Sequence, residues 1–178
     1  DDVAWTLPGN DTITGSAGAD FIASGMGDDI VYGGNDNDTI FGEDGQDTLF
    51  GQGGDDVING GTGDDTIVWK QDGEDVIDST DGRDRVEIRG TSGVDTITVG
   101  QSGSTLTVTG SGSTLNLPNA MQDFANGLEE LVINGGNGAD VITITDVNTV
   151  GSILILANGQ NGDDTISAAG AALGVANL

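Results

Sequence analysis

Aliphatic residues recur with a fixed period of nine along the first third of the chain. Residues 6–68 divide into seven consecutive nine-residue units, and the eighth place of every unit is aliphatic. These residues are Ile13, Ile22, Val31, Ile40, Leu49, Ile58 and Ile67. The Thr-Ile-Val stretch that ends the last unit is typical of a short strand that points its middle side chain inward. The period therefore predicts a repetitive coil of short strands, in which each unit buries one aliphatic side chain against its neighbours.

Aspartate occupies the sixth place of every unit, and glycine the fourth place of all but one, where Asp36 stands instead. Glycine permits the positive φ that a tight turn needs, and Asp tolerates it better than most residues. If two units make one turn, residues 18 apart lie about 4.8 Å apart as stacked neighbours. This spacing predicts one column of Asp11, Asp29, Asp47 and Asp65, and a second of Asp20, Asp38, Asp56 and Asp75.

The phase of nine breaks after Val68, and the character of the sequence then changes. We expect a lead-in at 1–5, a regular array at 6–68, degenerate repeats at 69–99 and a wider solenoid at 100–178. In the last two segments Asp75, Asp84 and Asp95 continue the pattern at irregular steps, and Asp140 and Asp164 lie in isolated units.

Alternating β-branched stretches and continuous apolar runs predict strands in the second half. They lie at 96–99, 105–109, 114–117, 131–133 and 153–156. Residues 118–126 read as a loop or a short helical turn. The uncharged C-terminal stretch 168–178 reads as a frayed end, a cap, or the place where a longer solenoid was cut. The whole chain is therefore expected to be all-β, with narrow 18-residue turns first and wider turns later.

The composition limits what can hold such a coil together. Only 35% of the 178 residues are hydrophobic and 4% are aromatic, and one buried aliphatic side chain in nine cannot offset the conformational entropy of ordering the unit. The chain has 30 acidic and 4 basic residues, a net charge of −26. This charge argues against nucleic-acid binding and against an anionic membrane surface. No apolar run is long enough for membrane insertion.

Columns of carboxylates repel one another unless cations lie between them. Cysteine and histidine are absent, which removes disulfides and the usual zinc, copper and haem ligands. Calcium accepts six to eight oxygen ligands at about 2.3–2.6 Å in flexible geometry, whereas magnesium demands a stricter octahedron. We therefore expect calcium, with five ions between Asp pairs 18 apart in the regular array and further ions beyond it. The candidate metal ligands are Asp11, Asp20, Asp29, Asp38, Asp47, Asp56, Asp65, Asp75, Asp84, Asp95, Asp140 and Asp164.

The unit pattern G-G-x-G-x-D-x-aliphatic-x resembles the nonapeptide of the RTX (repeats-in-toxin) family. The units GGNDNDTIF at 33–41 and GGTGDDTIV at 60–68 match it nearly letter for letter. The resemblance implies a right-handed parallel β-roll that binds calcium in its turns through the repeat Asp residues and loop carbonyls. It also implies a chain that stays unfolded in a low-calcium cytosol, leaves the cell by type I secretion and folds outside it.

The main functional hypothesis is a calcium-folded, secreted or cell-surface solenoid that serves as a structural, adhesive or secretion-associated module, without enzymatic activity. Its expected partners are calcium ions, with end-to-end self-association or cell-surface and matrix components as further options. One alternative is a carbohydrate- or ice-binding face made by outward threonines such as Thr12, Thr39, Thr48 and Thr66. Another is a β-helix enzyme acting on polysaccharides, in which the cluster Arg83, Arg85 and Arg89 would neutralise a uronate.

Overall fold

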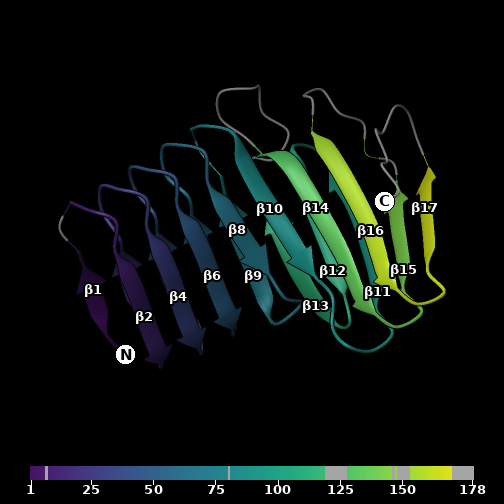
Figure 1. Ribbon diagram of the computed structural model, residues 1–178, viewed down its shortest axis with the longest axis horizontal. Coiled ribbons are helices and arrows are strands. Elements are labelled where there is room, and N and C mark those ends of the chain that lie inside the picture. The colour runs from purple at the N-terminus through teal and green to yellow at the C-terminus, as the bar shows by residue number, and fades with distance from the viewer. Residues whose placement is uncertain (7, 80, 119–127, 146, 148–152, 170–178) are drawn as a thin grey trace.

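The protein folds into two β-sheets that face each other across one hydrophobic core (Figure 1). The computed structural model describes residues 1–6, 8–79, 81–118, 128–145, 147 and 153–169. The ten-stranded sheet has the order β1 (Val3–Trp5), β3 (Phe21–Ala23), β5 (Thr39–Phe41), β7 (Val57–Asn59), β9 (Glu74–Asp78), β13 (Ser113–Leu117), β12 (Thr105–Gly110), β11 (Thr96–Ser102), β15 (Val141–Thr145) and β17 (Thr165–Ala169). The seven-stranded sheet has the order β16 (Leu154–Asn161), β14 (Leu128–Asn137), β10 (Asp84–Arg89), β8 (Thr66–Trp69), β6 (Thr48–Gly53), β4 (Ile30–Asn35) and β2 (Thr12–Ala17).

Among the described residues there is no helix, so none could cross a membrane. All pairings between strands of successive turns are parallel, which makes the chain a solenoid of the β-roll or β-helix type, as the sequence predicts.

The first half winds regularly between the two sheets. Even-numbered strands from β2 to β8 pair in one sheet and odd-numbered strands from β1 to β9 in the other. Residues 18 apart are neighbours, as in the pairing of Val31 with Leu49 and of Ile40 with Ile58. The eighth-place aliphatic residues are all buried, none more than 9% exposed, and they form a single stack inside the coil. The predicted aliphatic interior is therefore confirmed.

The turns need left-handed backbone at two places of the unit. The fourth place has positive φ throughout the regular array, and Asp36 adopts it with a φ of 73° in place of glycine. A side chain here must also avoid the stacked turn, since a Cβ on Gly45 would overlap the carbonyl group of Gly27. From the second unit onward the second place is left-handed too, and Glu43 (φ 71°) and Gln52 (φ 79°) adopt this strained backbone conformation there.

The second half departs from the expected wider parallel coil. Strands β11, β12 and β13 form an antiparallel meander inserted in the ten-stranded sheet, between β9 and β15. The seven-stranded sheet has no such insertion, because β10 pairs directly with β14. The meander therefore lengthens one turn, so that stacked neighbours such as Asp95 and Asp140 are 45 residues apart, against 24 for Asp140 and Asp164. Antiparallel neighbours joined by short loops were missed because strand patterns do not reveal pairing partners.

Each of the five strands expected in the second half overlaps an observed one, namely β11, β12, β13, β14 and β16. The expected loop at 118–126 falls almost entirely outside the described residues, and so does the C-terminal end from residue 170 onward.

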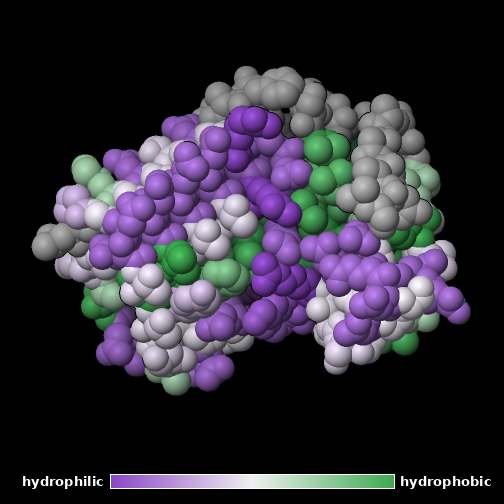
Figure 2. Space-filling model, viewed as in Figure 1, coloured by the Kyte–Doolittle hydropathy of each residue, from purple (hydrophilic) through white to green (hydrophobic). Residues whose placement is uncertain are grey.

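The outer faces of the sheets carry mixed rows of side chains. Strand register places Ile30 between Thr12 and Thr48, so the threonine row is interrupted on the seven-stranded sheet. Tyr32 and Phe50 stack with ring centroids 4.8 Å apart and planes 12° apart. In contrast to these mixed faces, one edge of the solenoid is mainly hydrophilic. It is the upper edge in Figures 1 and 2, formed by the loops that lead into β2, β4, β6, β8 and β10.

Candidate metal centre

The repeat aspartates lie at the two edges of the solenoid, each directly before a strand or at its first residues. Column A, at the upper edge of Figure 1, contains Asp11, Asp29, Asp47, Asp65 and Asp84. Column B, at the lower edge, contains Asp20, Asp38, Asp56 and Asp75. Column C, beyond the meander at the same lower edge, contains Asp95, Asp140 and Asp164. The structure thus stacks all twelve candidate residues in three columns.

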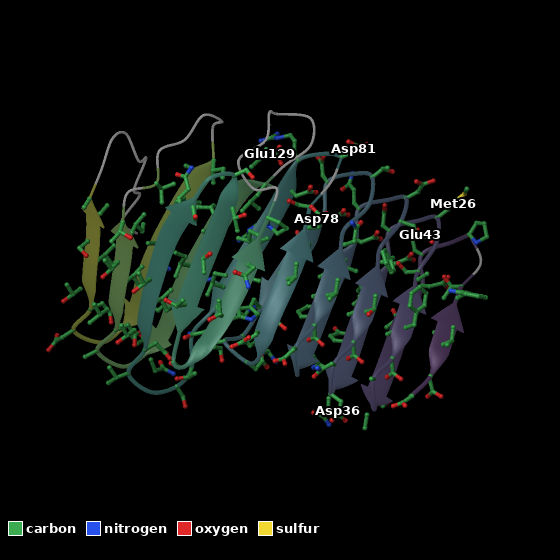
Figure 3. The ribbon with its side chains drawn as sticks, turned by 180° about the vertical axis from the view of Figure 1, so that it is seen from behind. Met26, Asp36, Glu43, Asp78, Asp81 and Glu129 are labelled. Atoms are coloured by element: carbon green, nitrogen blue, oxygen red, sulfur yellow. The ribbon has the colours of Figure 1, made fainter. Side chains whose placement is uncertain are left out.

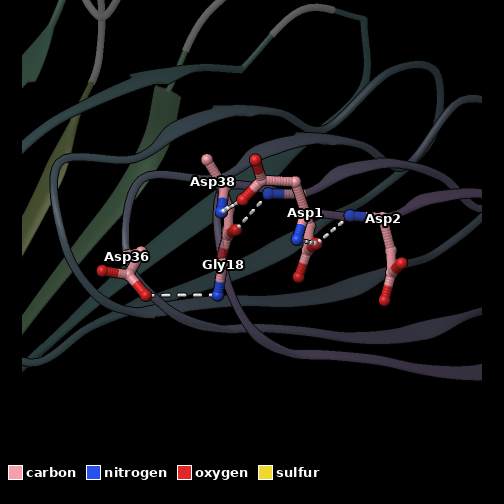
Figure 4. Close-up of polar contacts among 7 residues, drawn as sticks. Asp1, Asp2, Gly18, Asp36 and Asp38 are labelled. Carbon is pink, nitrogen blue, oxygen red and sulfur yellow. Dashed lines mark hydrogen bonds and ion pairs between the residues drawn. The ribbon is translucent and has the colours of Figure 1, made fainter.

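Hydrogen bonds link each column along the solenoid axis. Within a column, Oδ1 of one aspartate accepts a hydrogen bond from the backbone N–H of the aspartate one turn before it. The N–O distance is 2.8 Å from Asp29 to Asp47 and 2.9 Å from Asp47 to Asp65, and the link survives the irregular step from Asp65 to Asp84 at 3.0 Å. Figure 4 shows the first link of column B, which ends at Asp38, together with the bond from Gly18 N–H to Asp36.

The second carboxylate oxygen of most repeat aspartates is buried without a hydrogen-bond donor. This holds for Oδ2 of Asp20, Asp29, Asp38, Asp47, Asp65, Asp84 and Asp140. These residues are only 1–3% exposed. A buried ionised carboxylate is costly unless a donor or a cation compensates it, so these oxygens are suited to bind a cation.

Oδ2 points toward the first glycine of its own unit. A Cβ added to Gly33 would overlap Oδ2 of Asp38 and would lie 2.8 Å from the carbonyl oxygen of Gly51, one turn on. Gly33 does not have positive φ, so glycine is required here by space and not by backbone conformation. The first glycine leaves room where a carboxylate oxygen and a carbonyl oxygen from two successive turns approach each other.

Burial raises the pKa of the column carboxyls above the ordinary value of 3.8. The pKa of Asp47, Asp56 and Asp84 rises to about 6, and that of Asp65 and Asp75 to about 7. Desolvation is the main cause in each, partly offset by the hydrogen bond from the stacked amide, and neighbouring carboxylates add a further increase. A nearby cation would favour the ionised form and reverse these shifts.

The loops at the upper edge are themselves hydrogen-bonded from turn to turn. Met26, Asp44, Thr62 and Asp81 form successive parallel bridges outside the strands. The third-place carbonyl accepts from the fourth-place amide one turn before, as Asp44 O does from Gly27 N at 2.8 Å. Each carbonyl oxygen has two lone pairs, so a loop carbonyl that accepts one hydrogen bond can still coordinate a cation.

The donor set suits a hard cation whose ligands are mainly oxygen atoms of the backbone. Within the described ranges no three acidic side chains group closely enough to hold a metal ion by themselves. Two column aspartates one turn apart must therefore be completed by carbonyl oxygens or water. Calcium takes such mixed carboxylate and carbonyl shells, so the residues present fit it.

Some of the other column aspartates have surroundings of a different kind, among them Asp75, Asp95 and Asp164. The indole N–H of Trp69 donates to Oδ2 of Asp75. Asp95 accepts from the Thr91 amide at 2.7 Å and from the hydroxyls of Thr91 and Ser111. Protein donors thus already engage both oxygens of Asp75 and of Asp95. Asp164 is half-buried, so its column ends in a more open setting.

The fifth place of the unit carries a second ladder that runs in the opposite direction. Asp28, Asp55 and Asp64 at this place are exposed. Their Oδ1 atoms nevertheless accept hydrogen bonds from backbone amides one turn later, as in the 3.0 Å bond from Gln46 N to Asp28. The recurrence of Asp and Asn at this place (Asn10, Asp28, Asn37, Asp55, Asp64) was the signal that could have revealed it.

One acidic residue of the site lies outside every repeat. Glu129 Oε2 accepts a hydrogen bond of 2.6 Å from the backbone N–H of Asp84, the role that a repeat aspartate has elsewhere in the column. Figure 3 shows Glu129 at the same edge as Asp81, opposite the edge of Asp36. Glu129 lies 45 residues after Asp84 and belongs to no nonapeptide unit, so the repeat pattern gave no signal for it.

Comparison with protein families finds a known repeat in this sequence. A family model described as the RTX calcium-binding nonapeptide repeat (4 copies) matches residues 1–31, 32–67 and 132–143. No curated protein matches the chain significantly. The matched residues contain columns A and B up to Asp65, as well as Asp140 of column C. These segments of the chain are therefore identified as RTX calcium-binding nonapeptide repeats, as the sequence predicts.

Proposed function

We propose that this chain is a module of a larger secreted protein that folds when calcium binds between the turns of its solenoid. The observation that carries the proposal is the run of buried carboxylate oxygens without hydrogen-bond donors, stacked at both edges of the coil. Without a cation these charges oppose folding, because burial disfavours the ionised form. A cation bound between two stacked carboxylates removes their repulsion and cross-links the two neighbouring turns.

Calcium would be held by successive aspartates of one column and by loop carbonyls between them. Asp29 with Asp47, and Asp38 with Asp56, represent the two edges of the regular array. Because the unfolded chain lacks this arrangement, calcium binding to the folded chain adds its free energy to stability. The expected number is five ions in the regular array, with others further on.

Secretion and folding outside the cell follow from this dependence. A chain that stays unfolded at low cytosolic calcium passes through a narrow export channel and folds where calcium is abundant. We therefore place it outside the cell or at its surface, as a structural or adhesive segment exported by type I secretion. We propose no catalytic role, since the columns explain the buried acidic residues by stacking and cation binding.

Far-UV circular dichroism during a calcium titration tests the proposal, with magnesium as the control. The expected result is a disordered spectrum in chelator that converts cooperatively to β structure at roughly 0.1–1 mM calcium, as in extracellular calcium modules, and not with magnesium. A full β spectrum in excess chelator at neutral pH would overturn it, because calcium would then not be what folds the chain.

A further inference from the structure

A surface pocket of about 390 Å³ lies where column A reaches the first wide turn of the solenoid. Asp84, the last repeat aspartate of this column, lines it together with Asp64, Arg83 and Glu129. The column continues physically beyond Asp84 although the nonapeptide pattern does not. The pocket thus joins a repeat residue to a part of the chain that no repeat describes.

A β-bulge in β14 places the side chain of Glu129 next to Asp84. Strand β10 pairs with β14 so that Asp84 lies opposite Leu128 and Arg85 opposite Glu130, which leaves Glu129 as the extra residue. Bulges of this kind redirect a side chain without breaking the sheet. The redirected carboxylate accepts the Asp84 amide hydrogen bond and so replaces the aspartate that the next unit would have supplied.

The buried side of the pocket contains an uncompensated charge. Asp84 is 1% exposed, and its Oδ2 has no hydrogen-bond partner. Of the two arginines at the pocket, Arg85 forms an ion pair with Glu130, with 3.5 Å between Nε and Oε2. The remaining charges are the carboxylates of Asp64, Asp84 and Glu129 against the guanidinium of Arg83. The balance at the pocket therefore favours a cation.

We propose that this pocket is an additional calcium site, in which Glu129 from outside the repeats and Asp84 from the last unit of column A supply the carboxylates. Backbone carbonyls and water complete the shell, as calcium permits. The site rests on the proposed function, since it uses the same stacking of carboxylates one turn apart. It differs in that Glu129 lies outside the residues that match the RTX repeat. It would fasten the regular coil to the wide turns that follow.

Equilibrium dialysis of the full chain with calcium counts the ions bound at saturation. Glu129→Gln removes the charge but keeps an oxygen that can accept the Asp84 amide, and it is expected to lose one ion per chain. Glu74→Gln is the matched control: Glu74 is exposed on β9, and the change alters the net charge equally. Its ion count is expected to equal that of the wild type. If Glu129→Gln and the wild type bind the same number of calcium ions, the proposed site is refuted.

Arg83→Gln gives a test that does not touch the two proposed ligands. Removing the opposing guanidinium is expected to tighten the binding of one calcium ion severalfold, and an unchanged binding curve would argue against the site. A wild-type chain that binds no calcium would refute the proposed function itself, and this site with it. A wild type that folds with calcium while both variants behave like it would refute the pocket alone.

Discussion

The indole N–H of Trp69 donates a hydrogen bond to Oδ2 of Asp75, the oxygen that has no donor in Asp65 and Asp84. Trp69 ends β8, and its side chain is 3% exposed within the core. The step from Asp56 to Asp75 is also the first that spans 19 residues and not 18. A protein donor thus compensates the carboxylate at the point where the regular period ends.

Trp69→Phe tests this compensation. The variant keeps an aromatic ring in the core but leaves Oδ2 of Asp75 without its donor, which should cost about 1–3 kcal/mol of unfolding free energy. Urea denaturation in saturating calcium measures the loss. Trp5→Phe is the control, because Trp5 is 74% exposed and its replacement should leave the midpoint nearly unchanged. Equal midpoints for the two variants would show that the Trp69 hydrogen bond contributes nothing.

Asp47→Asn should weaken calcium binding far more than Asp44→Asn, although both occur in one unit and remove one charge. Asp47 is buried with Oδ2 unpartnered, whereas Asp44 is exposed on the turn. Even outer-shell changes lower metal affinity about 10–100-fold, so loss of a ligand charge should raise the calcium midpoint at least about tenfold. Calcium titrations followed by circular dichroism compare the two. Similar midpoints would refute the ligand role of column A.

Gly33→Ala should destabilise the fold, whereas Gly53→Ala should not. A Cβ at Gly33 overlaps Oδ2 of Asp38, and such overpacking costs about 1–3 kcal/mol. A Cβ at Gly53 would lie 3.8 Å from its nearest neighbours, and this glycine also lacks positive φ. Its replacement should be neutral or should stabilise the fold by up to about 1 kcal/mol, because alanine lowers the conformational entropy of the unfolded chain. Thermal unfolding in calcium distinguishes them, and a stable Gly33→Ala would mean that the carboxylate can move away freely.

In the absence of calcium, acid should favour folding. The pKa values of Asp65 and Asp75 are raised to about 7, and those of Asp47, Asp56 and Asp84 to about 6, by burial. The folded chain therefore binds more protons than the unfolded chain between about pH 4 and 7, and its stability falls as the pH rises through this window.

Circular dichroism in calcium-free buffer from pH 4 to 8 tests the predicted loss of stability with rising pH. The β signal should decline as pH rises, with a midpoint near 6 to 7 if the buried columns are responsible. A transition confined to about pH 4, the range of carboxyl groups in model peptides, would instead implicate the general negative charge of the chain. With calcium present the trend should reverse, because the ligands must be deprotonated to bind.

The sequence by itself determined the regular half of the protein. A period of nine with an aliphatic residue at the eighth place allows only short strands with one side chain inward, and two units to a turn place Asp29 over Asp47. Both features depend only on the repeat itself, because every unit of the regular array packs against neighbours of the same kind. The turn sizes and the domain limits drawn from the sequence stay predictions.

Only the tertiary structure decided which strands are antiparallel and which oxygens lack partners. The meander of β11, β12 and β13 depends on pairing between strands, which periodicity does not encode. The need for Gly33 comes from the carboxylate of Asp38, and the role of Glu129 comes from a bulge opposite Asp84. These features arise where segments distant in sequence meet, so their physical cause, steric overlap or an unpaired buried charge, exists only in the folded chain.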